Sequence, residues 1–134
     1  MPDLEPHRLP IRVYYEDTDA GGIVYHASYL RFAERARTEF LRSLGMDHAT
    51  LLAEHGGFFV VTRIEIDFRR PALLDDVLAV ETTVASTTRA RLVMRQIVTR
   101  GQEALAEMLV TLAFLSRQHR PLRLPNLQAP AAPR

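Results

Sequence analysis

The side chains best suited to chemistry gather in one short segment, residues 13–26. Three carboxylates, two glycines, aromatic rings and a histidine lie there within a few positions of one another: Tyr15, Glu16, Asp17, Asp19, Gly21, Gly22, Tyr25 and His26. The segment leads into a predicted helix, whose first turn presents free backbone N–H groups and the positive end of the helix dipole. Carboxylates beside such donors can serve catalysis, because the donors stabilise developing negative charge.

The three carboxylates differ in their position relative to the preceding strand. Strand alternation points Glu16 and Tyr15 to opposite sides, and Asp17 falls where the strand ends. We therefore predict that Glu16 and Asp17 are scaffold, and that Asp17 bonds loop amides. Asp19 has two open interpretations, a reactive carboxylate or an Asx turn that only shapes the loop. The acids lack the spacing of a calcium loop, and we expect no metal site.

A strand and a loop must hold this segment in place. Residues 9–15 are predicted as the strand, with Ile11, Val13 and Tyr15 on one face. Residues 16–27 are predicted as the loop, and the glycine pair within it permits unusual backbone angles.

The strongest helix signal follows over residues 28–44. Ser28 is the predicted N-cap and Gly45 the predicted C′ residue. A short second helix is predicted over residues 47–55. Apolar residues recur at spacings of three and four on one face of the long helix: Tyr29, Ala33, Ala36, Phe40 and Leu44.

From residue 58 onward the hydrophobic period changes to two, which indicates strands. After this first strand, three more are predicted, over residues 77–85, 91–99 and 104–116. The expected fold is α+β, with a meander of four consecutive antiparallel strands curling around the helix. Residues 104–115 are apolar on both faces, as in a strand buried on both sides or at a subunit interface. A homo-oligomer is therefore expected.

Length and composition restrict the remaining possibilities. The 134 residues fit one domain, expected over residues 1–120, with a Pro/Ala-rich tail over 121–134 that is predicted to be disordered or loosely docked. There is no cysteine or lysine, which excludes thiolate sites and lysine Schiff bases. The net charge of +1 does not favour nucleic acid. No signal peptide or membrane-spanning run is recognised, and a cytoplasmic location is expected.

The run Tyr14-Tyr-Glu-Asp-Thr-Asp-Ala-Gly-Gly-Ile-Val-Tyr-His-Ala-Ser-Tyr-Leu-Arg-Phe-Ala-Glu-Arg-Ala-Arg-Thr-Glu-Phe-Leu41 closely resembles the Tol-Pal-associated, YbgC-like acyl-CoA thioesterase family. It is more distantly similar to 4-hydroxybenzoyl-CoA thioesterase. The similarity continues weakly through Phe68 and residues 74–77. It implies the hotdog fold, a five-stranded antiparallel sheet around one long central helix. It also implies hydrolysis of acyl-CoA, with no cofactor because coenzyme A is part of the substrate.

By this resemblance, Asp19 matches the family's catalytic carboxylate, acting as nucleophile or general base. His26 has two implied roles. Its backbone N–H, with the amides around Tyr25, polarises the thioester carbonyl, or its imidazole orients water or Asp19. Tyr15 is the further candidate, through a hydrogen bond to Asp19 or to substrate.

The expected substrate contacts lie in and beyond the loop. Gly22 and Tyr25 belong to the loop, while Phe58 and Phe59 are candidates for an acyl pocket. By resemblance, Arg89 and Arg91 approach the nucleotide of coenzyme A, since guanidinium groups suit phosphates. Arg69 and Arg70 are the next candidates for that role. The expected substrate is an acyl-CoA or acyl-carrier-protein thioester. The expected assembly is a tetramer or dimer.

Two other functions stay open at this point. A hotdog dehydratase of acyl thioesters needs a histidine base paired with an acid across a shared site, which fits poorly with both residues in one loop. A non-catalytic acyl-thioester or carrier-protein binding module, associated with lipid or envelope proteins, is the other alternative. The intact acidic loop argues against it.

Overall fold

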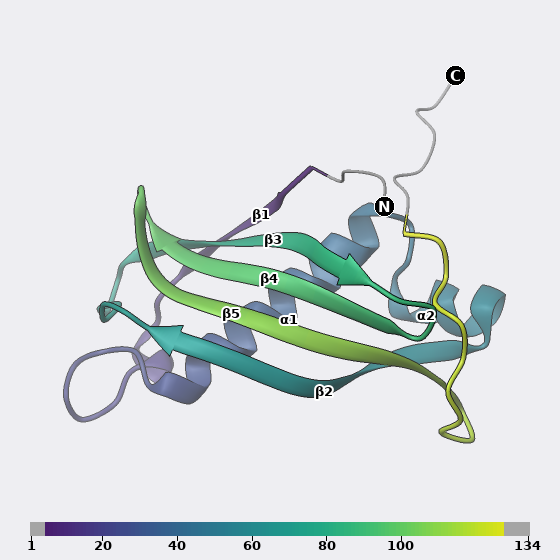
Figure 1. Cartoon of the computed structure of the whole chain (residues 1–134). Coiled ribbons are helices and arrows are strands. Elements are labelled where there is room, and N and C mark those ends of the chain that lie inside the picture. The colour runs from purple at the N-terminus through teal and green to yellow at the C-terminus, as the bar shows by residue number, and fades with distance from the viewer. Residues whose placement is uncertain (1–4, 128–134) are drawn as a thin grey trace.

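The computed structural model describes residues 5–127. A 3₁₀ turn (Tyr15–Asp17) follows the first strand, and a π-helical segment (Leu51–His55) follows the second helix. The helices and strands are β1 (His7–Arg12), α1 (His26–Ser43), α2 (His48–Thr50), β2 (Gly57–Phe68), β3 (Val77–Thr87), β4 (Arg91–Arg100) and β5 (Glu103–Ser116). The strands form one antiparallel sheet, and α1 runs along one face of it (Figure 1).

The order of strands in the sheet is β1-β3-β4-β5-β2. The predicted meander is therefore correct for β3, β4 and β5 but wrong for β2, which pairs with β5 at the far edge. The reason lies in β5, which is apolar on both faces and takes a neighbour on each side. The segment over residues 69–76 then carries the chain from β2 back to β3.

The predicted apolar stripe of α1 is confirmed. Its five members are all buried, and Phe32 beside them is fully buried as well. Burying a side chain as large as Phe32 or Phe40 contributes roughly 1.5–3 kcal/mol to stability. This face of α1 lies against the inward residues of the sheet, which together form the core.

The start of α1 differs from the prediction, and its end agrees with it. The helix begins at His26, with Tyr25 as N-cap, because the Ser28 hydroxyl donates to the Asp17 carbonyl at 3.0 Å instead of capping. At the other end, Gly45 has φ 74° and occupies the C′ position. The Met46 N–H donates to the Leu41 carbonyl at 2.8 Å, the bond that defines a Schellman motif.

The first strand ends earlier than predicted. It stops at Arg12, and Val13 then exchanges backbone hydrogen bonds with residues 75–76. Ile11 and Val13 are buried as expected, but Tyr15 is 82% exposed, so its predicted place on the same face is wrong. The chain leaves the strand direction at the 3₁₀ turn, where the N–H of Asp17 donates to the Tyr14 carbonyl.

Part of the predicted tail packs against the domain. Leu122 and Leu124 donate backbone hydrogen bonds to the carbonyls of Phe114 and Arg89, and Leu127 is 4% exposed. The domain limit at residue 120 remains a prediction, and the tail beyond residue 127 lies outside the described residues. Within residues 5–127, none of the helices has the length and hydrophobicity needed to cross a membrane.

Candidate functional site

A cavity of about 320 Å³ lies where the acidic loop, the first turn of α1 and the segment after β2 come together. Both Asp19 and His26 belong to it, so the structure brings these two predicted residues to one place. The other residues that line it are Ile23, Val24, Tyr29, Phe68, Arg69, Arg70 and Pro71. A carboxylate and a helix entry therefore share a cavity with largely apolar walls.

The Asp19 carboxylate is exposed, and its two oxygens differ. Oδ1 accepts a hydrogen bond from the Gly21 N–H at 2.9 Å, which is the Asx turn weighed above. Oδ2 has no hydrogen bond to any residue in the described part of the chain. One oxygen thus fixes the orientation of the carboxylate, and the other is available to a water molecule or to a substrate.

The first turn of α1, whose residue His26 lines the same cavity, offers backbone donors. The Tyr25 N–H is already used, because it donates to the Asp17 carbonyl at 2.9 Å. The N–H of Ser28 donates to the Tyr25 carbonyl at 2.8 Å. Between them, the amides of His26 and Ala27 have no acceptor among residues 5–127. These two amides, rather than that of Tyr25, can receive an oxyanion.

The His26 ring lies against a neighbouring aromatic ring. The centroids of the Tyr25 and His26 rings are 4.5 Å apart, and both side chains are exposed. Tyr25 is absent from the cavity lining. The contact of Tyr25 with substrate therefore stays a prediction. The contact that the structure shows is between the Tyr25 and His26 rings, and it supports the position of the His26 ring.

The prediction that Asp17 bonds loop amides is confirmed. Asp17 is buried, and its Oδ2 accepts from the Tyr14 N–H at 2.8 Å. Its carbonyl oxygen accepts the Ser28 hydroxyl as well as the Tyr25 N–H. Asp17 therefore joins the loop to the start of α1.

Two arginines, Arg69 and Arg70, form part of the cavity wall. The N–H groups of Arg69 and Arg70 both donate to the Leu105 carbonyl. Their side chains pair with Glu107 at 3.0 Å and Glu103 at 3.3 Å, and both remain more than half exposed. From the sequence, Arg69 and Arg70 were ranked below Arg89 and Arg91 as phosphate ligands. The signal that could have ranked them higher is that they directly follow a predicted strand, whose end lies beside the entry of α1.

A polar clamp holds the chain behind this wall. Arg100 donates to the Asp76 carboxylate at 2.7 Å, to Glu103 at 2.6 Å and to the Pro71 carbonyl at 3.3 Å. Hydrogen bonds to Asp76 and Glu103 raise the pKa of Arg100. Burial raises the pKa of Tyr29, whose hydroxyl accepts the Ala72 N–H at 3.1 Å. The wall is therefore fixed to both the sheet and α1.

Comparison with known proteins identifies the family. A model of the thioesterase-like superfamily matches residues 13–133. The chain belongs to this superfamily. It is 50% identical over 105 residues to the acyl-CoA thioesterase YbgC of Haemophilus influenzae, covering 78% of this chain and 77% of that protein. It is 35% identical over 126 residues to the acyl-CoA thioesterase YbgC of Helicobacter pylori, covering 87% and 92%.

Solved structures agree with this assignment to the thioesterase-like superfamily. A probable thioesterase from Bartonella henselae superposes with a TM-score of 0.87 at 40% identity, covering 90% of this chain and all of that one. The predicted YbgC-like resemblance is confirmed, as is the hotdog fold of a five-stranded antiparallel sheet with a helix.

Several predicted site residues lie outside the cavity of this thioesterase-like protein. Tyr15 is exposed in the 3₁₀ turn, and its side chain has no hydrogen bond to Asp19 within the described chain. Phe58 and Phe59 are at the start of β2, whereas Phe68 at its end lines the cavity. The ring of Phe58 meets His119, and that of Phe59 packs on Phe114. Gly22 is in the loop, where its φ of 79° favours glycine.

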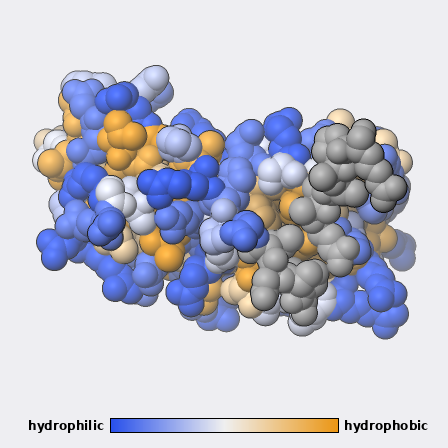
Figure 2. All heavy atoms as spheres, turned by 90° about the horizontal axis from the view of Figure 1, so that it is seen from above, coloured by the Kyte–Doolittle hydropathy of each residue, from blue (hydrophilic) through white to orange (hydrophobic). Residues whose placement is uncertain are grey.

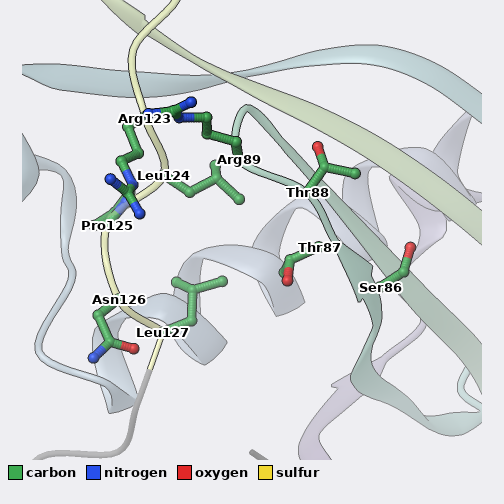
Figure 3. A pocket seen from close by; sticks show the side chains of 9 residues that line it. All are labelled: Ser86, Thr87, Thr88, Arg89, Arg123, Leu124, Pro125, Asn126 and Leu127. Atoms are coloured by element: carbon green, nitrogen blue, oxygen red, sulfur yellow. The ribbon is translucent and has the colours of Figure 1, made fainter. Parts of the chain in front are cut away.

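Arg89 lies at the other end of the sheet, in the turn between β3 and β4 (Figure 1). There it lines a second cavity, of about 490 Å³, together with Arg123 from the C-terminal segment; Figure 3 shows the two side chains close together. Arg91 is exposed at the start of β4. Within one chain, Arg89 and Arg91 are thus separated from Asp19 by the length of the sheet.

The surface around the acidic loop is mixed in character. Hydrophobic residues gather at that end of the molecule, on the left of Figure 2, among hydrophilic ones. Exposed aliphatic side chains from the loop, from the segment before β3 and from the first residue of β3 are Ile23, Leu73, Leu74 and Val77. Within residues 5–127, no group of three histidine, aspartate or glutamate residues is placed to hold a metal ion.

Proposed function

We propose that this protein is an acyl-CoA thioesterase, which hydrolyses an acyl-CoA thioester to a free acid and coenzyme A. The observation that carries the proposal is that the Asp19 carboxylate shares one cavity with His26, whose backbone amide at the start of α1 has no acceptor among residues 5–127. The relatives named above as acyl-CoA thioesterases support the substrate class. No cofactor is required, because coenzyme A is part of the substrate.

The chemistry follows from these groups. In one route Asp19 takes a proton from water as the oxygen adds to the thioester carbonyl; in the other its oxygen adds directly, and water then cleaves the resulting anhydride. In both routes the amides of His26 and Ala27 receive the oxyanion, and each such donor is typically worth about 10²–10³ in kcat. The coenzyme A sulfur can leave as a thiolate without protonation by a strong acid, because a thiol like that of cysteine has a pKa of about 8.5.

The first experiment measures hydrolysis of a panel of acyl-CoAs by the wild-type protein and by Asp19→Asn. The substitution keeps the side-chain volume and a carbonyl acceptor for Gly21, so the loop is expected to survive while kcat falls at least a thousand-fold. Glu16→Gln is the matched control, since Glu16 is exposed and outside the cavity. Equal rates in wild type and Asp19→Asn would overturn the proposal.

The same preparation separates the two alternative functions. Hydration of an enoyl-CoA without hydrolysis would indicate a dehydratase. Saturable binding of acyl-CoA without any turnover would indicate a binding module. Acyl-carrier protein is tested as a second thiol carrier, because the cavity recognises an acyl group next to a thioester in either case.

Phosphate recognition is part of the proposal. Arg69 and Arg70 lie in the wall beside Asp19, where their half-exposed guanidinium groups can meet an anionic carrier. Arg89 and Arg91 reach the same substrate only if a second copy brings them to it. Raised KM with unchanged kcat in Arg70→Gln would support the first assignment.

Self-association is proposed on two features of the sheet. β2 is an edge strand, so one side of it presents a row of backbone groups to which another strand can bond. The outward residues of β5 are only half-buried, although many are apolar. A dimer or tetramer would cover these surfaces. In each copy, α1 is proposed to be the long central helix around which the sheet curves. Association with the Tol-Pal system is proposed from family resemblance alone. The cytoplasmic location expected from the sequence is kept as part of the proposal.

A further inference from the structure

A third cavity, of about 430 Å³, lies between the C-terminal half of α1, the α2 region and β2. This size is within the roughly 300–1,000 Å³ typical of small-molecule sites. None of its lining residues belongs to the cavity that holds Asp19. Its apolar walls are formed by Leu41, Met46, Leu51, Phe59, Val61 and Leu112.

One buried cation also lines this cavity. Arg37 is 8% exposed, and its Nη1 donates to Gln96 Oε1 at 3.0 Å. Gln96 is itself held by bonds from its Nε2 to the Ala33 carbonyl and to the Thr82 hydroxyl. One edge of the guanidinium is therefore fixed in place from the core side.

The remaining donors of Arg37 reach the cavity. Among residues 5–127, the one fully buried side-chain polar atom without a partner is Nδ1 of His7, so no nitrogen of Arg37 is both sealed off and unbonded. Arg37 has no carboxylate within 4.0 Å in that part of the chain, although the charge of Glu34 acts on it from a distance. A charge that is nine-tenths buried and lacks a counter-ion is costly, and an anion bound there would relieve that cost.

The other polar groups at the cavity do not provide this anion. The Asp47 carboxylate is engaged as the cap of α2, where it accepts the Thr50 hydroxyl at 2.7 Å and the Thr50 N–H. Glu34 and His48 are exposed at the rim. A ligand that fits must therefore combine one anionic oxygen group for Arg37 with an alkyl chain for the apolar walls.

The geometry points to a binding site for an alkyl carboxylate, that is, a fatty acid whose carboxylate pairs with Arg37 and whose chain lies along the apolar walls. A guanidinium presents two parallel N–H groups to a carboxylate, which makes such pairs short and directional. Binding of a free fatty acid requires no thioester chemistry. The site is therefore testable whether or not the proposed hydrolysis is found.

The methionines of the chain give a local readout. Met46 lines this cavity, Met94 and Met108 are buried in the core, and no methionine lines the cavity that holds Asp19. In protein labelled with ¹³C at the methionine methyl groups, decanoate should shift the Met46 signal saturably. 1-Decanol, which has the chain without the charge, should bind with a dissociation constant at least ten-fold higher than that of decanoate. Acetate, which has the charge without the chain, should leave the signal in place.

Variants then test the role of the charge. Arg37→Met keeps an unbranched apolar side chain and should bind decanoate no better than 1-decanol, whereas Arg37→Lys should retain part of the preference. Arg35→Gln is the matched control, since Arg35 is exposed on the same helix and absent from this cavity. If Arg37→Met does not fold, the comparison of decanoate, 1-decanol and acetate on the wild type and on Arg37→Lys still tests whether the charge of residue 37 contributes to binding.

Three results would overturn the inference. The first is equal affinity for decanoate and 1-decanol in the wild type. The second is a Met46 signal that does not respond to decanoate. The third is a Met46 signal that changes with protein concentration in the absence of ligand, because the cavity would then be filled by a second copy of the chain.

Discussion

The carboxylate of Asp17 accepts the backbone N–H of Tyr14 at 2.8 Å, within the turn that connects β1 to the candidate site. The carbonyl of Asp17 accepts the Tyr25 N–H and the Ser28 hydroxyl at the start of α1. One buried residue thus joins three points of the loop. The placement of Asp19 depends on these bonds, because Asp19 lies between the two ends that they hold.

Asp17→Ala should therefore weaken both the fold and the activity. Removing the carboxylate leaves the N–H of Tyr14 without its partner, which costs about 1–3 kcal/mol where the group cannot be hydrated. Urea denaturation should show this loss, and kcat should fall with it. Asp17→Asn keeps an acceptor and should recover most of the stability. An Asp17→Ala protein as stable as the wild type would contradict this account.

His26→Ala separates the two roles of this residue. If the backbone amide is what matters, the amide persists and kcat should fall by less than about ten-fold. If the imidazole handles a proton, the loss should be about 10²–10⁴-fold. We expect the smaller effect, since the ring is exposed and packs on Tyr25. Steady-state hydrolysis of one acyl-CoA across pH 5–9 measures the difference.

Two adjacent glycines should respond differently to alanine. At Gly57 an added Cβ would lie 2.6 Å from the Leu115 carbonyl oxygen and 2.9 Å from the Phe114 ring. At Gly56 there is open space, and only the φ of 70° opposes a side chain, at about 1–2 kcal/mol. Gly57→Ala should therefore lower the free energy of unfolding more than Gly56→Ala does. Thermal melts of both variants give the comparison, and the reverse order would be inconsistent with the β2–β5 register.

Acid should destabilise the protein partly through Asp76. Burial alone would raise the pKa of Asp76, but hydrogen bonds from the Leu73 N–H and Arg100 outweigh it and lower the pKa. A carboxyl with a lowered folded-state pKa contributes stability above its unfolded pKa of about 3.9, and this contribution is lost as pH falls through the folded value. Asp76→Asn should therefore lose less stability than the wild type between pH 5 and pH 2, as measured by urea denaturation.

The sequence predicted local features well where one segment determines them. The stripe of α1, the Gly45 terminus and the amide bonds of Asp17 all follow from spacing or residue type within a few positions. The N-cap was misplaced because the Ser28 hydroxyl can either accept a backbone N–H as a cap or donate to a carbonyl, and only the position of the Asp17 carbonyl decides between these two roles. That position depends on tertiary structure.

Longer-range pairing was not accessible in the same way. Both β3 and β5 are suitable neighbours for β2 by alternation, and the choice depends on how the sheet closes over α1. Arg69 was ranked low for the same reason, since its proximity to Asp19 depends on where β2 ends. Phe58 and Phe59 are distant from the acidic loop in the sequence and also in the fold. They lie at the start of β2, which runs the length of the sheet, whereas the end of β2 lies at the cavity that holds Asp19.

The sheet order has a consequence for synthesis of the protein. β2 is made before β5, the strand to which it bonds, so it leaves the ribosome with no partner available. At roughly 5–20 residues per second, the wait lasts about several seconds. During that time the run Phe58-Phe-Val-Val61, which is apolar and free of proline, is exposed to other nascent chains. Expression at reduced temperature or with a chaperone that covers such segments should therefore raise the yield of soluble protein.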